Sequence, residues 1–235
     1  YILEAAPAHK RGTYACWQVV AQGVAAMAAG TVGYTLTQVL SPEDLNSWGW
    51  RVPFVFGLLV LPIGIYIRRN LAETFHGQGE TASTGSLVRQ VFGEHRRALV
   101  LGLLILSGST ITQYFINYMT TFALTELKLP TSISMLSTLV AGAAMAVCAI
   151  AGGMLCDRFG RRTILMAPRV VLLLVLFPAL QLMTEHPSPT TFLLTLAVLS
   201  GLHGMSGAAL IVLLVESFPK AVRSTGFSIV YAFGV

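Results

Sequence analysis

Long apolar runs separated by short polar turns make up most of this chain. An uncharged run of about 20 residues is long enough to cross the hydrocarbon core of a bilayer as a helix. A further apolar run starts at residue 227 and continues to residue 235. The pattern therefore predicts an all-α polytopic membrane protein. The expected spans are residues 14–40, 52–67, 98–125, 129–156, 163–184 and 187–215.

The composition supports the same class. The chain is 54% hydrophobic and only 11% charged, whereas soluble domains carry about 25% charged residues. A soluble domain of this size would lack the charges to cover its surface. The cysteines Cys16, Cys148 and Cys156 lie in or beside apolar runs, so we expect free thiols and no extracellular disulfide framework.

The basic residues give the orientation. Twelve of the 15 Lys and Arg residues fall in loops on one side of the expected spans, against Arg51 and Lys128 on the other. Cytoplasmic loops carry this kind of excess, so the first side is cytoplasmic and the net charge of +5 requires no nucleic-acid partner. The cytoplasmic set is Lys10, Arg11, Arg68, Arg69, Arg89, Arg96, Arg97, Arg158, Arg161, Arg162, Lys220 and Arg223.

An internal repeat indicates the domain organisation. Residues 4–11 and residues 216–223 both have the form Glu-x-x-Pro-x-x-x-Arg, and six spans separate them. The polar segment 68–97 is rich in Gly, Ser and Thr at its centre, which is typical of a flexible linker. We therefore expect two parallel six-helix bundles, with 1–67 ending the first, 68–97 as a cytoplasmic linker and 98–235 in the second. In this arrangement the chain runs from the end of helix 4 to the start of helix 11.

Four stretches resemble a known family. The turn Gly152-Gly153-x-x-x-Asp157-Arg158-x-Gly160-Arg161-Arg162 resembles the loop between the eighth and ninth helices of the major facilitator superfamily. Residues 1–12, 48–54 and 71–74 resemble the metabolite:proton symporter group within it. Sugar porters share the Glu-x-x-Pro-x-x-x-Arg-Gly form, so they remain an alternative. The resemblance implies a partial major facilitator fold, two six-helix bundles incomplete at both ends.

The resemblance also implies a cytoplasmic charge network that holds the bundles together in the outward-facing state. We expect Glu216 to pair with Arg158 or Arg161, and Arg223 to pair with Asp157. Asp157 is also placed to cap the helix that follows it. The alternative is a set of solvated anchors that only fix the topology. The expected network is Glu4, Arg11, Asp157, Arg158, Gly160, Arg161, Arg162, Glu216 and Arg223.

The glycines of this turn have separate expected uses. Gly152 and Gly153 allow a close approach between helices, and Gly160 provides for a positive φ. Small residues at four-residue spacing predict close helix packing elsewhere as well. These sets are Ala25-Ala29-Gly33, Gly142-Ala146 and Ala149-Gly153.

The span 98–125 carries a polar stripe. Its members recur at steps of three or four and therefore share one helix face. Polar groups at membrane depth require a cavity or a partner helix, so this face is the expected substrate path, with Gln113, Tyr114 and Asn117 as contacts. Interhelical hydrogen bonding is the alternative. The stripe is Ser107, Thr110, Gln113, Tyr114, Asn117 and Thr121, with Tyr118 one position off it.

Two further side chains lie inside spans. Arg169 follows Pro168, which is expected to kink the helix, and either faces the cavity to bind a carboxylate or extends toward the cytoplasm. His203 is suited to proton exchange near neutral pH, or is an ordinary interhelical donor. No Asp or Glu lies deep in a complete span, so an essential proton-carrying carboxylate is expected in helices outside these residues.

Together these features predict a secondary active transporter that works by alternating access. Its partners would be a small organic acid or zwitterionic metabolite, protons (by resemblance) and the lipid bilayer, with no catalytic residue, metal or cofactor. We expect a monomer when complete, in the plasma (bacterial inner) membrane, with loops 1–13, 68–97, 157–162 and 216–226 cytoplasmic. A sugar or drug porter of the same superfamily, or a transporter-like sensor without flux, is the alternative.

Overall fold

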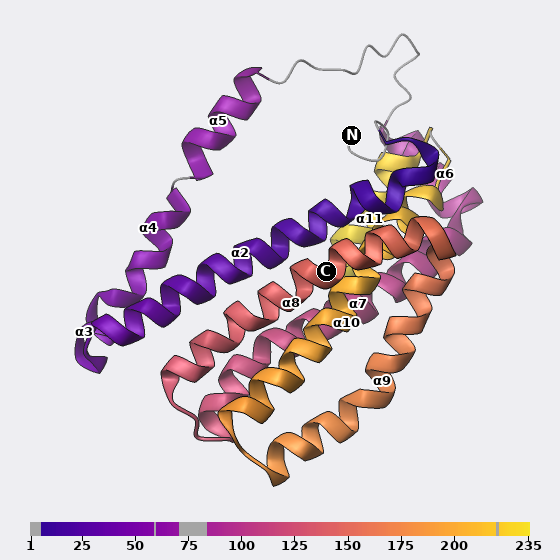
Figure 1. Cartoon of the computed structure of the whole chain (residues 1–235). Coiled ribbons are helices and arrows are strands. Elements are labelled where there is room, and N and C mark those ends of the chain that lie inside the picture. The colour runs from indigo at the N-terminus through magenta and orange to yellow at the C-terminus, as the bar shows by residue number, and fades with distance from the viewer. Residues whose placement is uncertain (1–5, 59, 71–83, 220) are drawn as a thin grey trace.

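The computed structural model describes residues 6–58, 60–70, 84–219 and 221–235 (Figure 1). Within these residues the chain is helical, and no strand is present. Its helices are α2 (Arg11–Val39), α3 (Pro42–Ser47), α4 (Val52–Leu58), α5 (Val60–Asn70), α6 (Thr84–Glu94), α7 (Arg96–Thr125), α8 (Thr131–Phe159), α9 (Arg161–Glu185), α10 (Pro189–Glu216) and α11 (Arg223–Gly234), with 3-10 turns at Ala8–Lys10 and Gly49–Arg51.

Six segments of the described chain are long and apolar enough to cross a membrane. Each coincides with one of the spans expected from the sequence, which confirms the prediction of a polytopic all-α protein. The seventh apolar run begins inside α11. The spanning segments are Arg11–Val39, Gly49–Arg69, Arg96–Thr125, Thr131–Phe159, Arg161–Glu185 and Pro189–Glu216.

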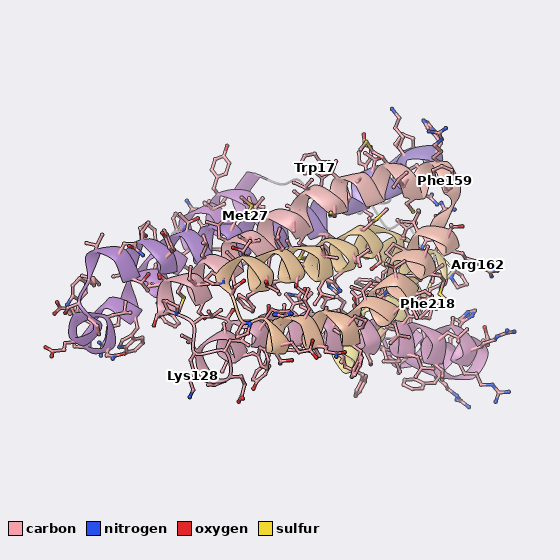
Figure 2. All side chains as sticks on the ribbon, turned by 60° about the horizontal axis from the view of Figure 1, so that its bottom comes forward. Trp17, Met27, Lys128, Phe159, Arg162 and Phe218 are labelled. Atoms are coloured by element: carbon pink, nitrogen blue, oxygen red, sulfur yellow. The ribbon has the colours of Figure 1, made fainter. Side chains whose placement is uncertain are left out.

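Helices α8 and α10 form the centre of the bundle. α8 packs against α2 on one side and α10 on another, and α9 packs against α10 (Figures 1 and 2). α7 contacts α8, α10 and α11. In contrast, α4 and α5 diverge from the bundle after the turn at α3 (Figure 1), and none of their described side chains is fully buried. The core therefore lies between α2 and α7–α11.

Glycines allow α2 and α8 to approach closely. A Cβ added to Gly23 would lie 2.7 Å from the carbonyl oxygen of Gly142, so a larger residue at either position would separate the helices. Gly142, Ala146, Ala149 and Gly153 are buried, as expected for helix packing. The prediction for α2 is wrong at two positions, because Ala25 and Ala29 are exposed. Gly23 and Gly30 fill the buried positions of α2 instead.

The segment before α7 differs from the flexible linker that its composition predicts. The central residues 71–83 lie outside the described part of the chain, but Thr84–Glu94 forms helix α6. Val91 of α6 is fully buried in the core cluster that includes Phe218 and Val222, and Leu87 packs beside it. Residues four apart share a helix face, so this apolar pair attaches α6 to the bundle.

Candidate functional site

The turn between α8 and α9 lies at one end of the bundle. Figure 2 shows Phe159 and Arg162 at this end and Lys128 at the opposite end, as the charge asymmetry of the loops predicts. Gly160 has φ of 89°, which confirms the expected positive φ and ends α8. The turn therefore places Arg161 beside the end of α10.

Asp157 of α8 caps the start of α2. The Lys10 side chain at the N-cap position of α2 makes no capping hydrogen bond. Instead, the backbone N–H of Gly12 donates to Asp157 Oδ1 at 2.7 Å, and the N–H of Thr13 donates to Oδ2 at 2.9 Å. The Thr13 hydroxyl donates to the same Oδ2 at 2.7 Å. A carboxylate at a helix N-terminus satisfies free amides and complements the helix dipole, so Asp157 joins α8 to α2.

Glu216 at the end of α10 accepts hydrogen bonds from two arginines. Arg11 Nη1 donates to Glu216 Oε1 at 2.7 Å, and Arg161 Nη2 donates to the same oxygen at 2.9 Å. The predicted contact between Arg161 and Glu216 is therefore present. All three side chains are partly exposed, between 25% and 40%, so solvent screens their attraction. We name Arg11, Asp157, Arg161 and Glu216 the cytoplasmic latch.

Two predictions about this network are not met. The prediction that Arg223 pairs with Asp157 is wrong, because Arg223 Nε donates to the carbonyl oxygen of Phe218 at 3.3 Å. The expectation that Asp157 caps the helix after it is also wrong, since α2 takes its carboxylate and Gly160 precedes α9 without a side-chain cap.

The predicted network also included Arg158, Arg162 and Glu4. The Arg158 guanidinium lies 5.3 Å from the ring centre of Phe159. Arg162 is exposed. Glu4 lies outside the described residues. None of the three contributes a described contact to the cytoplasmic latch.

A cavity of about 240 Å³ lies between α2, α7, α10 and the end of α11. Gln113, Tyr114 and Asn117, the expected substrate contacts, all line it, and so does His203. Gln113 Nε2 donates to Asn117 Oδ1 at 3.2 Å, and Gln113 Oε1 is buried without a hydrogen-bond partner among the described residues. A buried polar atom without a partner is costly, which indicates a position where a ligand can bind.

The other residues of the polar stripe on α7 fall into two groups. Thr110 lines the cavity, but its hydroxyl donates to the carbonyl oxygen of Gly234 at 2.8 Å and so connects α7 to α11. For Thr110 the structure therefore shows interhelical hydrogen bonding, the alternative that the sequence left open for the polar stripe. Ser107, Thr121 and Tyr118 do not line the cavity. The substrate-facing part of the stripe is therefore its middle.

Sequence reasoning missed Gln18 and Gln22 of α2, which line the cavity opposite α7. These are carboxamides four residues apart on one face of an otherwise apolar span, the same signal that marked α7. Ser109 of α7 was also missed. The α2 glutamines place polar groups from the two predicted bundles on facing walls of one cavity.

Arg169 and His203 lie beside each other on α9 and α10. The guanidinium is close enough to the imidazole for an electrostatic interaction between them. Arg169 Nε and Nη2 are buried and have no hydrogen-bond partner within the described chain, so two of its guanidinium nitrogens are enclosed by the protein. Arg169 does not line the cavity, whereas His203, only 8% exposed, does.

Comparison with known proteins agrees with this architecture. The chain is 37% identical over 237 residues to a citrate-proton symporter of Klebsiella pneumoniae, covering 99% of this chain and 53% of that protein. It is 30% identical to the inner membrane metabolite transport protein YhjE of Escherichia coli strain K12, covering 97% and 54%. It is 25% identical to the alpha-ketoglutarate permease of the same strain, covering 99% and 54%.

The chain spans about half the length of these curated relatives. No solved structure matches it. The relatives agree with the resemblance to the metabolite:proton symporter group. Residues 1–235 match the sequence profile of the Major Facilitator Superfamily. The chain therefore belongs to the major facilitator superfamily, a family of multi-pass membrane transporters and not of enzymes.

Proposed function

We propose that the complete protein is a secondary active transporter that carries a small organic acid together with protons by alternating access. The observation that supports this most directly is the cavity between α2, α7 and α10, which has a latch of ion pairs and a helix cap at its cytoplasmic end. A cavity closed at one end by reversible polar contacts is what alternating access requires. The relatives named as citrate-proton symporters and alpha-ketoglutarate permease favour an acid as cargo.

The charges near the cavity favour an anionic substrate over a sugar. The guanidinium of Arg169 can pair with a carboxylate, and its Nε and Nη2 are buried without a partner in the described residues. His203 lines the cavity and interacts electrostatically with Arg169. A substrate carboxylate bound at His203 would compensate the guanidinium. Proline/betaine transporters are also relatives, so a zwitterion whose carboxylate uses the same groups is the second candidate.

The cytoplasmic latch supplies the outward-facing closure in this proposal. Residues 1–67 belong to the first bundle, 68–97 connect the bundles, and 98–235 belong to the second. Across the bundle interface, Glu216 then holds Arg11 and Asp157 holds the N-terminus of α2, while Arg161 pairs with Glu216 inside the second bundle. Separation of these contacts opens the cavity to the cytoplasm. The protein resides in the inner membrane, as the name of one relative states for that protein.

Uptake by the full-length protein tests the proposal. Proteoliposomes containing it are given radiolabelled citrate with an inward proton gradient, and then with the gradient collapsed by a protonophore. We expect accumulation only with the gradient. Binding without accumulation would identify a sensor, and uptake of glucose in preference to citrate would identify a sugar porter; either result contradicts the proposal.

A further inference from the structure

A second cavity of about 330 Å³ lies beside the first. Gln113, Asn117 and Met145 line both cavities and therefore form the partition between them. The second cavity extends along α7 to Thr120 and along α10 to Ser200. Both directions lead away from the cytoplasmic latch, because α7 begins and α10 ends at the cytoplasmic side. The two cavities are thus stacked along the direction of transport.

The second cavity contains polar atoms without partners. Ser200 is 1% exposed, lines this cavity, and its Oγ finds no hydrogen-bond partner in the described chain. Gln113 Oε1 is likewise unpartnered, and its own amide nitrogen is committed to Asn117. The hydroxyls of Thr120 and Thr138, by contrast, lie 3.3 Å apart and pair with each other. In the buried wall of this cavity, Gln113 Oε1 and the Ser200 hydroxyl therefore remain available to a ligand.

The two cavities differ in charge. The first is lined by His203, which interacts electrostatically with the Arg169 guanidinium. The second is lined by no Asp, Glu, Lys, Arg or His, all of its lining residues being described ones. An ammonium group would have no counter-charge there, and an ionised carboxylate would face the carbonyl oxygen of Gln113. An uncharged group that donates a hydrogen bond satisfies Gln113 Oε1 without either penalty.

We propose that the Ser200 cavity is a second subsite of the substrate path, which receives an alcohol hydroxyl of the substrate. The ionised carboxylate of the same molecule faces His203 and Arg169. This inference rests on the proposed function for the identity of the cargo as an organic acid. It narrows that cargo to acids that carry a hydroxyl beside the ionised carboxylate, and it disfavours zwitterions without a hydroxyl.

The test compares two acids that differ by one hydroxyl. Citrate and propane-1,2,3-tricarboxylate share the same carboxyl groups, and only citrate has the hydroxyl. Binding to the detergent-solubilised full-length protein is measured by ligand-induced thermal stabilisation, which depends on binding and not on flux. The variants are Ser200→Ala and the matched control Ser206→Ala. Ser206 is also buried on α10, but its hydroxyl donates to the carbonyl oxygen of His203, and it lines neither cavity.

We expect the wild-type protein to bind citrate about 3–10-fold more tightly, the effect of one net hydrogen bond. Ser200→Ala should remove most of this preference without changing the affinity for the tricarboxylate, and Ser206→Ala should keep it. Equal affinities in the wild type, equal losses in both variants, or no binding of either acid would overturn the subsite. Binding with the expected preference but without uptake would leave the subsite in place and refute the proposed function.

Discussion

The cytoplasmic latch and the central cavity lie along the same helices, yet they treat polar groups in opposite ways. At the latch, Asp157 accepts three hydrogen bonds and Glu216 accepts two, all from groups within the chain. Around the cavities, Gln113, Arg169 and Ser200 each have a buried polar atom without a partner in the described residues. The one latch atom that resembles the cavity in this respect is Arg11 Nε.

This difference separates groups that stabilise one conformation from groups prepared for a ligand. Partnered groups at the latch favour the closed arrangement of α2 against α8 and α10, so their removal should shift a conformational equilibrium. Unpartnered groups in the cavity are costly until a ligand binds, so their removal should weaken binding without destabilising the protein. The following variants of the full-length protein test this comparison.

Charge reversal of Asp157 should have the largest effect. In Asp157→Arg, a cation replaces the carboxylate at the N-terminus of α2, so three hydrogen bonds become unavailable and the helix dipole is opposed. We expect citrate uptake to fall by roughly 100-fold, since hydrogen bonds to charged groups are individually substantial. Glu126→Arg, a reversal at an exposed position after the end of α7, is the control for a change in charge alone. Intact uptake by Asp157→Arg would remove the latch from the mechanism.

Replacement of Arg169 should affect binding and stability differently. The Arg169→Gln variant lacks the guanidinium that would pair with the carboxylate of the substrate. We therefore expect roughly 10–100-fold weaker citrate binding. The melting temperature without ligand should stay the same or rise, because Nε and Nη2 have no partners to lose. Arg89→Gln, at an exposed position of α6, should change neither quantity. If the melting temperature fell together with the affinity for citrate, Arg169 would be a structural residue and not a substrate contact.

Neutralisation of Glu216 should weaken the cytoplasmic latch but leave its helix cap intact. In Glu216→Gln the ion pairs to Arg11 and Arg161 are lost, while the cap by Asp157 remains. Cys16 and Cys156, which are 2% and 3% exposed, should then react roughly 3–10-fold faster with a membrane-permeant maleimide, the change expected from loss of about 1 kcal/mol.

A Cys148→Ser background removes the third thiol from this measurement. The matched control is Glu185→Gln, whose carboxylate accepts only from Gln181 on its own helix and lies away from the latch. The same labelling rate in Glu216→Gln and in the unmodified background would show that the ion pairs do not hold α2 in place.

The smallest effect on transport is expected at Gly160, where only backbone conformation is involved. A Cβ at Gly160 would meet nothing within 4 Å, but φ is 89°. Gly160→Ala should therefore reduce the stability of the protein by about 1–3 kcal/mol through strain alone. Gly108 is helical and also has open space around it, so Gly108→Ala should stabilise by up to about 1 kcal/mol. Reversible denaturation in detergent measures both, and equal effects would show that the turn is not strained.

Part of the candidate site could be predicted from the sequence. Gln113, Tyr114 and Asn117 were found because polar residues at helical spacing within an apolar span are conspicuous. Gln18 and Gln22 give the same signal with only two members, and were missed. Arg223 was paired with Asp157 as part of the charge network that the family resemblance implies, but the partner of Asp157 is the amide end of α2. Backbone donors carry no sequence signal, so this cap required the structure.

The sequence by itself determined which segments cross the membrane and which loops lie on the cytoplasmic side. Apolar length and the distribution of Lys and Arg are local properties, and the bilayer imposes them on each segment separately. Only the tertiary structure decided which faces of those helices meet. It buried Gly23 and Gly30 of α2 in place of Ala25 and Ala29, enclosed two guanidinium nitrogens of Arg169, and left Ser200 Oγ without a partner among the described residues. These outcomes depend on the rotation and spacing of neighbouring helices, which no single segment encodes.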